Sequence, residues 1–228
     1  MAVRPLWLCA MSVAVALSAS SCGGGGQTQL RMLNASPGQP ELNLLVDGKT
    51  VASNLAYGAA SGYISINSGS RQIQIEPAGS SNSIINQTLS FGSDTSSTLV
   101  VDNYSANVQS VVFSDDNTAP ASGNFRVRVI NASPSMGAVD VYVLPAGTSL
   151  SGATPLATSL AFGSASDYAG LAAGSPATTY NIYFTQPGTT FSYIVVSTSF
   201  TAGDVRTIVA LNNLAGGYTT VTLKDVGS

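Results

Sequence analysis

The sequence predicts an all-β protein composed of two tandem antiparallel β-sandwich domains. Three observations lead to this prediction. Apolar and polar residues alternate over short runs, which is the pattern of half-buried strands. Pairs such as Ser-Pro, Asp-Gly and Pro-Gly separate these runs and are typical of turns. One set of sequence blocks also occurs twice in the same order, and no segment keeps a helical apolar stripe for three turns.

Residues 1–21 have the features of an export signal. Arg4 gives a positive start, a mostly apolar run follows, and small residues precede Cys22. The apolar run is shorter than the ~20 residues that span a membrane. The small residues at 19–21 before Cys22 resemble the lipobox of bacterial lipoproteins, with Ala19 where that motif usually has Leu. An ordinary secretory signal with a chance cysteine is the alternative.

The lipobox resemblance implies that cleavage precedes Cys22 and that acylation of this cysteine anchors the chain to a membrane. Residues 22–28 would then form a flexible tether, since they are rich in Gly and lack an apolar pattern. Gly23 stands where a lipoprotein retained in the Gram-negative inner membrane has Asp. The expected location is therefore the cell envelope, and the outer membrane if the source is Gram-negative.

The rest of the chain contains one module twice. Its blocks at residues 30–37, 42–46, 55–63, 90–91 and 98–100 match those at 127–134, 139–143, 160–168, 199–200 and 207–209. The first blocks lie 97 residues apart, whereas solenoid repeats have periods of about 20 to 50 residues. We therefore expect two domains, 29–116 and 125–228, joined by a linker at 117–124 that contains Pro120 and Gly123.

Each module is expected to contain seven or eight strands. In the first module they should begin near residues 30, 42, 51, 62, 71, 84, 98 and 108. That number of short strands in a module of this length is typical of an antiparallel, immunoglobulin-like sandwich.

The second module contains Arg-Val-Ile-Asn-Ala-Ser-Pro at 128–134, Val-Asp-Val-Tyr-Val at 139–143 and Leu-Ala-Phe-Gly at 160–163. With counterparts in the first module, this pattern resembles the DUF4397 domain, a bacterial extracytoplasmic module of unknown function. The resemblance covers nearly all of the chain after the signal.

The chain departs from the family pattern in two places. Asn34 and Asn131 stand where the family usually has His, and Asn43 of the first module replaces the acid that the second keeps as Asp140. The resemblance therefore implies no catalytic residues for this chain.

The composition limits the chemistry further. Of 228 residues, 8 are Lys or Arg, 11 are Asp or Glu and none is His, for a net charge of −3. Nucleic acid is not an expected partner, because phosphate contacts dominate such binding and the chain has no basic cluster. Triads that need an imidazole and metal sites that need His are excluded.

Three groups of residues are candidate sites, each with a structural alternative. The repeated Asn-Ala-Ser-Pro is expected to form a turn. Asp115, Asp116 and Asn117 could offer oxygens to calcium, but they match no known calcium loop and a run of acids next to a linker is usually solvated, so no metal site is predicted. The aromatic residues Tyr57, Tyr63, Phe162 and Tyr168 could stack on sugars, although core or cross-strand pairing is commoner.

The two modules differ by insertions in the second, at 144–155 and around 176–179. Loops tolerate insertions and often carry function. We hypothesise that the two enlarged loops lie at the same end of the second domain and contact either a partner or the first domain. The residues concerned are Leu144, Pro145, Leu150, Pro155, Pro176 and Thr179.

Together these features favour a non-catalytic binding or structural module, anchored to the envelope through Cys22 and without a cofactor. Its expected partners are the membrane and an envelope protein or glycan of unknown identity. The alternatives are a carboxylate-based glycan-processing enzyme and a glycan-binding adhesin. Two carboxyl groups within about 10 Å in a cleft would favour the enzyme.

Overall fold

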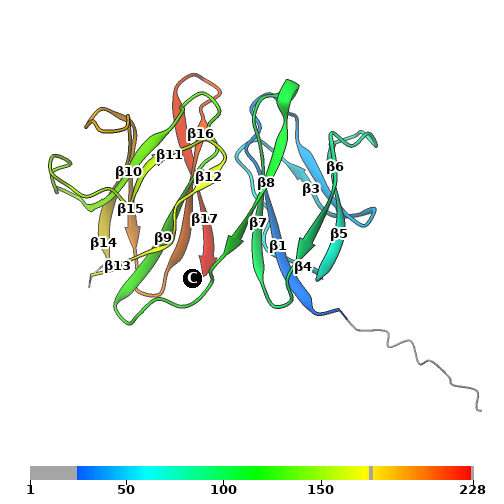
Figure 1. Ribbon diagram of the computed structural model, residues 1–228, viewed down its shortest axis with the longest axis horizontal. Helices are drawn as coiled ribbons and strands as arrows, with labels where there is room; N and C mark the ends of the chain where they lie inside the picture. Colours follow the sequence, from blue (N-terminus) through cyan, green and yellow to red (C-terminus); the bar gives the residue numbers. More distant parts are fainter. Residues whose placement is uncertain (1–24, 175–176, 227–228) are drawn as a thin grey trace, which may run out of the picture.

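The computed structural model describes residues 25–174 and 177–226, which form two β-sandwiches side by side (Figure 1). The expected signal at 1–21, the expected acylation site Cys22 and the loop residue Pro176 lie outside the described residues. Among the described residues, no helix is long and apolar enough to cross a membrane.

The first repeat consists of two four-stranded sheets, with strand orders β4-β1-β7-β8 and β3-β2-β5-β6. Its strands are β1 (Gln27–Asn34), β2 (Leu42–Val46), β3 (Lys49–Leu55), β4 (Ile64–Asn67), β5 (Gly69–Pro77), β6 (Ile85–Phe91), β7 (Ser96–Asp102) and β8 (Gln109–Asp115), with the short 3-10 helix η1 (Ser105–Asn107) before β8.

The second repeat has the same arrangement, with sheets β12-β9-β16-β17 and β11-β10-β14-β15. Where the first repeat has β4, two short strands, β12 and β13, pair with β9. The strands are β9 (Asn124–Asn131), β10 (Val139–Pro145), β11 (Ala157–Leu160), β12 (Ser164–Ala165), β13 (Ala169–Ala172), β14 (Thr178–Thr185), β15 (Ser192–Phe200), β16 (Val205–Asn212) and β17 (Tyr218–Val226).

The predicted all-β fold with two sandwiches is confirmed, with one difference in strand direction. β1 pairs with β7 in parallel, and β9 pairs with β16 in the same way. β1 lies between β4 and β7 and runs in the same direction as β7. In the second repeat β9 lies between β12 and β16 and runs in the same direction as β16. The sheets that contain these strands are therefore not purely antiparallel.

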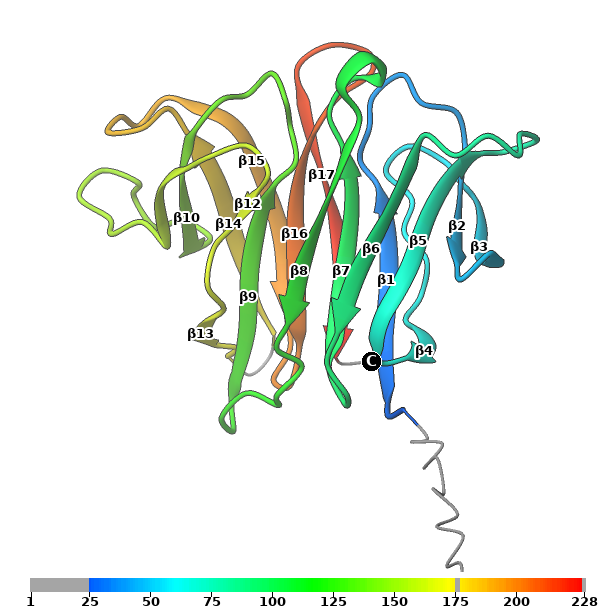
Figure 2. The ribbon, with the colours of Figure 1, turned by 45° about the vertical axis from the view of Figure 1, so that its right-hand side comes forward.

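These mixed sheets are the inner sheets of the molecule, because they face each other across the boundary between the repeats (Figures 1 and 2). Apolar residues from β1, β7, β9, β16, β17 and adjoining turns form one buried cluster there: Leu33, Ala35, Val100, Ile130, Ala132, Val209, Leu211 and Leu223. The other two sheets are the outer sheets. Each sandwich also has its own core.

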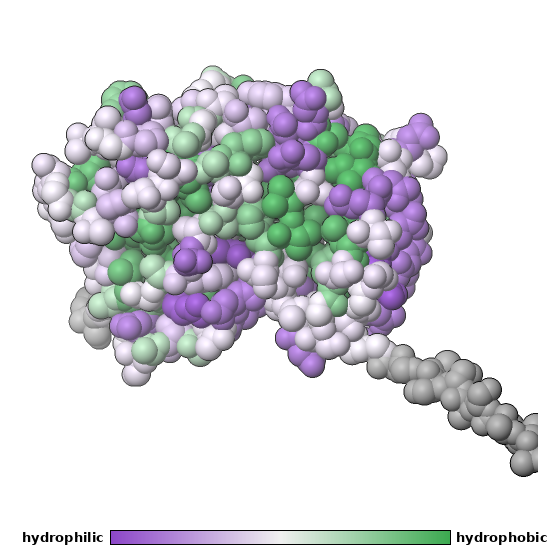
Figure 3. Space-filling view, viewed as in Figure 1, coloured by the Kyte–Doolittle hydropathy of each residue, from purple (hydrophilic) through white to green (hydrophobic). Residues whose placement is uncertain are grey.

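Strand β1 is buried on both faces. Leu30 and Met32 belong to the core of the first sandwich, whereas Leu33 and Ala35 belong to the cluster between the repeats. This double burial explains why apolar residues lie on both faces of the strand, at Leu30, Met32 and Leu33, instead of on one face only. On the outside, apolar residues reach the surface in several places among polar ones (Figure 3).

The repeated Asn-Ala-Ser-Pro forms a turn in both repeats, as predicted. Asn34 is fully buried; its Oδ1 accepts from the backbone N–H of Ser36 at 3.2 Å, and its Nδ2 donates to the carbonyl of Leu55 at 3.0 Å. Asn131 repeats both bonds, with Ser133 and Leu160. The amide thus fixes the turn and ties it to a neighbouring segment.

Candidate functional site

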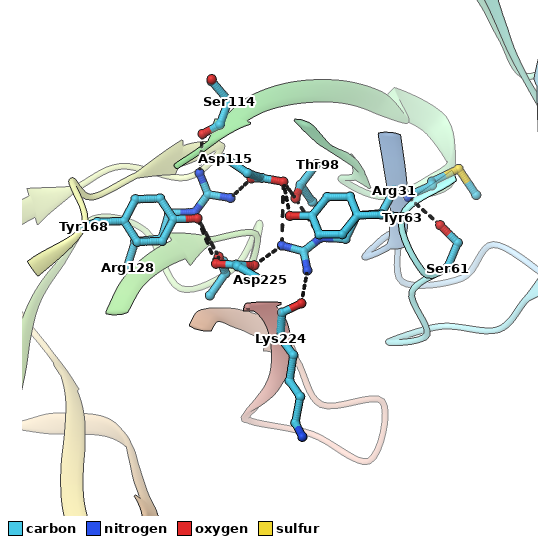
Figure 4. Close-up of polar contacts among 12 residues, drawn as sticks. Arg31, Ser61, Tyr63, Thr98, Ser114, Asp115, Arg128, Tyr168, Lys224 and Asp225 are labelled. Carbon is cyan, nitrogen blue, oxygen red and sulfur yellow. Dashed lines mark hydrogen bonds and ion pairs between the residues drawn. The ribbon is translucent and has the colours of Figure 1, made fainter. Parts of the chain in front are cut away.

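Four charged side chains meet between the inner sheets (Figure 4). Arg31 donates to Asp225 of the other repeat, and Arg128 donates to Asp115. The arginine side chains are 3% exposed and the aspartate side chains 0%. We call these four residues the ionic cluster. Each repeat supplies one cation and one anion, so the ion pairs link the repeats reciprocally.

Hydrogen bonds within each repeat orient the ionic cluster. Arg31 Nε donates to Thr98 Oγ1 at 2.9 Å, and this hydroxyl donates to Asp115 Oδ2 at 2.7 Å. In the second repeat Thr207 links Arg128 to Asp225 in the same way, at 3.0 and 2.7 Å. A threonine on the neighbouring strand therefore connects the arginine and the aspartate of each repeat.

Backbone carbonyls of the opposite repeat satisfy the remaining arginine donors. Arg31 Nη1 donates to the carbonyl of Lys224 at 2.9 Å, and Arg128 Nη1 donates to that of Ser114 at 2.7 Å. These carbonyls belong to the residues just before Asp225 and Asp115. Each guanidinium thus binds a carboxylate and its neighbouring carbonyl, and the buried charges are both paired and hydrogen-bonded, as stability requires.

Tyr63 and Tyr168 complete the ionic cluster. Their hydroxyls donate to Asp115 Oδ2 at 2.7 Å and to Asp225 Oδ2 at 2.8 Å. Burial raises the pKa of both hydroxyls, so they keep their protons and act as donors at neutral pH. The guanidinium carbons of Arg31 and Arg128 lie 4.6 and 4.8 Å from the two ring centroids. The two tyrosines therefore serve the contact between repeats, and neither presents a free ring for sugar stacking.

The other aromatic candidates are also partly buried. Tyr57 packs against the apolar cluster between the repeats and donates its hydroxyl to the carbonyl of Asn212 at 2.7 Å. Burial, together with the nearby Tyr104, raises the pKa of the Tyr57 hydroxyl to about 12. Phe162 is half-buried.

The expectation that the acids of 115–117 are solvated is wrong for Asp115. This residue ends β8 and points into the ionic cluster, because Arg128, Thr98 and Tyr63 all donate to it. Asp116 is exposed and pairs with Arg126 at 2.5 Å. Hydrogen bonding to this guanidinium holds the pKa of Asp116 well below its usual range.

Within 25–174 and 177–226, no three His, Cys, Asp or Glu side chains are close enough to hold a metal ion. The oxygens of Asp115 and Asp116 are engaged by arginines instead.

Asp115 and Asp225 are two carboxylates that the fold brings near one another. Both contact Arg31 Nη2, Asp115 through its Oδ2 at 3.8 Å. A shallow hollow of about 390 Å³ borders Asp115, but neither carboxylate side chain is exposed. A glycan-processing pair needs carboxylates that face a substrate and a water, whereas these face two arginines.

The sequence carried a signal for the ionic cluster. Arg31 and Arg128 lie in the matched blocks, 97 residues apart, and Asp115 and Asp225 lie 110 apart, close to the offset of the preceding block. In a chain with so few charges, a charged pair repeated at equivalent positions indicates a buried role.

The predicted contact loops lie on the outer sheet of the second repeat, on the side away from the first repeat (Figure 1). Leu144 and Pro145 end β10 and Thr179 lies in β14; the N–H of Ala146 donates to the carbonyl of Thr179 at 2.9 Å, so the two loops start side by side. Pro155 is half-buried.

The inner sheets, rather than these loops, join the repeats. The alternative in which the loops contact the first domain is therefore wrong, because the linker leads the chain into β9 of the inner sheet. Contact with a separate partner stays a prediction.

Residues 28–142 match the family described as a domain of unknown function, DUF4397. The chain belongs to this family. The match covers just over half of the DUF4397 protein and extends from β1 to β10. A second family unit over 125–228 stays a prediction. No curated protein sequence matches the chain significantly.

Three solved structures resemble this DUF4397 protein weakly. The carbohydrate-binding module CBMbc (family CBM26) of Eubacterium rectale Amy13K, in complex with maltoheptaose, has 11% identity and a TM-score of 0.28, covering 87% of this chain and 96% of its own. A family 41 carbohydrate-binding module from streptococcal virulence factors has 14% identity, and a streptococcal virulence factor described as binding alpha-glucan has 11%. Both have TM-scores of 0.27 and cover 80% of this chain and 92% of their own. Similarity at this level assigns no ligand to this chain.

Proposed function

We propose that this DUF4397 protein is a non-catalytic binding or structural module of the cell envelope, anchored through acylated Cys22. The observation that carries the non-catalytic part is the state of Asp115 and Asp225. The acids that the fold brings together are buried and paired with arginines, so they cannot act on a substrate. They hold the two repeats together instead.

The two sandwiches act as one body in this proposal. The apolar cluster between the inner sheets and the reciprocal ion pairs would both have to be exposed for the repeats to separate. Removing one member of a buried ion pair alone costs about 3–5 kcal/mol. The outer sheets are therefore presented in a fixed arrangement. Independent folding of 29–116 and 125–228 stays a prediction.

Anchoring is tested by replacing the cysteine. We expect the wild-type protein to partition into detergent and to incorporate labelled palmitate, whereas Cys22→Ala does neither. Cys9→Ala is the matched control, because Cys9 leaves with the signal in this proposal and its loss should change nothing. Recovery of Cys22→Ala in the salt-washed membrane fraction would contradict the lipid anchor.

A further inference from the structure

The outer sheet of the second repeat has a groove of about 500 Å³, within the size range of small-molecule sites. One wall is formed by the enlarged loop at Leu150–Ala153 and the other by the β14–β15 turn at Gly188–Thr190. Tyr142 of β10 lies between them and is half-buried. The groove thus uses the insertion that distinguishes the second repeat from the first.

Asp140 fixes one wall of this groove. It is 5% exposed; its Oδ2 accepts from the N–H of Gly188 and its Oδ1 from the N–H of Ser159, both at 2.7 Å. One carboxylate therefore ties both the β14–β15 turn and β11 to β10. In the first repeat Asn43 takes the place of Asp140, and its Oδ1 accepts from the N–H of Asn54 at 2.9 Å. Asp140 and Tyr142 both belong to the Asp-Val-Tyr of the family pattern, and both contribute to this groove: Asp140 holds one wall and Tyr142 lines it.

The aromatic character of this outer sheet also distinguishes the repeats. Tyr142 is opposite Tyr183 in the strand register, whereas the equivalent pair of the first repeat is Leu45 and Gln74. Next to Thr190, at the end of the turn, Phe191 is 63% exposed. The groove is therefore lined by one aromatic ring, that of Tyr142, where the first repeat has Leu45 at the equivalent strand position.

The lining indicates the chemistry of a ligand. Besides the Tyr142 ring it offers the hydroxyl of Thr190 and the backbone of Gly152, and none of the described lining residues is charged. The Thr189 hydroxyl and the N–H of Gly188 are already hydrogen-bonded within the protein. An uncharged ring with one apolar face and peripheral hydroxyls matches this combination, because aromatic faces pack against C–H groups while hydroxyl and backbone groups bind hydroxyls. A charged ligand would gain no counter-ion from these lining residues.

We propose that this groove binds a neutral sugar ring of a polysaccharide, with Tyr142 as the stacking residue and Asp140 as a positioning residue. The inference rests on the proposed binding function and gives it a site and a ligand class. It assigns binding to the second repeat, while the first repeat is the structural partner.

Calorimetric titration of the full-length protein in a sugar-free detergent tests this inference. The probes are soluble glucan, mannan and galactan, with an acidic polysaccharide for comparison. We expect one neutral polymer to bind, and Tyr142→Ala to weaken its binding by about tenfold or more. Tyr142→Phe, which keeps the ring, should bind like wild type. Leu45→Ala is the matched control at the equivalent position and should leave binding unchanged.

A second variant guards against misfolding of Tyr142→Ala. Thr190→Lys places a charge on the exposed rim and should also abolish binding while leaving the melting temperature unchanged. The inference is overturned if no neutral polymer binds, if the acidic polymer or a protein ligand alone binds, or if Tyr142→Ala and Thr190→Lys both bind normally. Release of reducing ends from a bound polymer would instead contradict the non-catalytic function and leave the groove assignment intact. The two failures are thus distinguishable.

Discussion

The inner sheets of the two repeats are closely alike, whereas their outer sheets differ. On the inner side, the Arg, Thr, Asp and Tyr of one repeat have identical counterparts in the other, at nearly identical distances. On the outer side, Tyr142 and Asp140 replace Leu45 and Asn43, and a longer loop follows. Each inner residue must fit the other repeat, so a change on one side requires a change on the other. The outer sheets carry no such requirement and can acquire separate roles.

The ionic cluster gives the largest expected effect. Asp225→Asn removes the anion hydrogen-bonded to Arg31, which keeps only the 3.8 Å contact with Asp115, and Asp115→Asn removes the anion paired with Arg128. Each change should lower the free energy of unfolding by about 3–5 kcal/mol, measured by urea denaturation. Because the cluster is nearly symmetric, the two variants should agree within about 1 kcal/mol.

A clear difference between these two variants would show that the repeats do not share the cluster equally. A loss below about 1 kcal/mol in both would contradict the buried reciprocal pairing.

The sandwich cores give the next comparison. Phe200 is fully buried and stacks on Phe125 with ring centroids 4.0 Å apart, whereas the first repeat, which has Phe91 in place of Phe200, has Thr28 at the position equivalent to Phe125. Phe200→Ala should cost about 3–5 kcal/mol. Phe91→Ala should cost about 1 kcal/mol less, because no aromatic stacking is lost. Thermal unfolding of both variants measures the difference, and equal losses would remove stacking as its cause.

Asp102 is the place where the inner sheets disagree. Strand alternation puts it on the face of Val100, toward the other repeat, and its counterpart Leu211 belongs to the apolar cluster there. Asp102 is fully buried, and neither carboxylate oxygen has a hydrogen bond of good geometry within the described residues. Burial raises its pKa from 3.8 to about 6, although the side chain of Gln109 opposes this.

Because its pKa is raised, Asp102 lowers the free energy of unfolding by an amount that depends on pH. Above about pH 6 the carboxylate is charged in both the folded and the unfolded chain, and the full burial cost applies. Between about pH 6 and 4 the folded chain takes up the proton first, so the cost disappears as the pH falls. Asp102→Asn should therefore stabilise the protein by about 2–3 kcal/mol at pH 8 and by much less at pH 4. The exposed Asp167→Asn is the control, and a gain independent of pH would contradict the assignment.

The fold was largely predictable from sequence because its signals are local and repeated. Strand alternation and turn pairs gave the positions of strands such as β2 and β5, and the recurrence of 30–37 at 127–134 gave the two sandwiches. The parallel pairing of β1 with β7 was not predictable in this way. It joins strands that are distant in the chain, and alternation carries no information about strand direction.

The ionic cluster depends on contacts between repeats, which no local pattern reports. Asp115 and Asp116 are neighbours next to a Pro- and Gly-containing linker, and composition alone assigns both to solvent. Only the end of β8 at Asp115 determines that the first carboxylate points inward and the second outward. The sequence indicated one part of the groove at Tyr142: the enlarged loop was predicted as a contact surface, and Leu150 of that loop lines the groove. The Pro-Gly pair at 187–188 is a turn signal, but nothing in the sequence indicated that this turn borders the groove, because it is tied to Asp140 through space.

The smallest expected effect comes from the second of these adjacent acids. Asp116 pairs with Arg126, but its side chain is 51% exposed, so water already solvates the charge and the pair adds little. Asp116→Asn should lower the free energy of unfolding by less than about 1 kcal/mol, and by less still in 1 M salt, which screens exposed pairs. Urea denaturation in low and high salt, run beside Asp115→Asn, makes the comparison directly. The loss in Asp115→Asn should persist in high salt, because its partners are buried. If both variants lost the same free energy of unfolding, the burial of Asp115 and the exposure of Asp116 would not determine how much each acid contributes to stability.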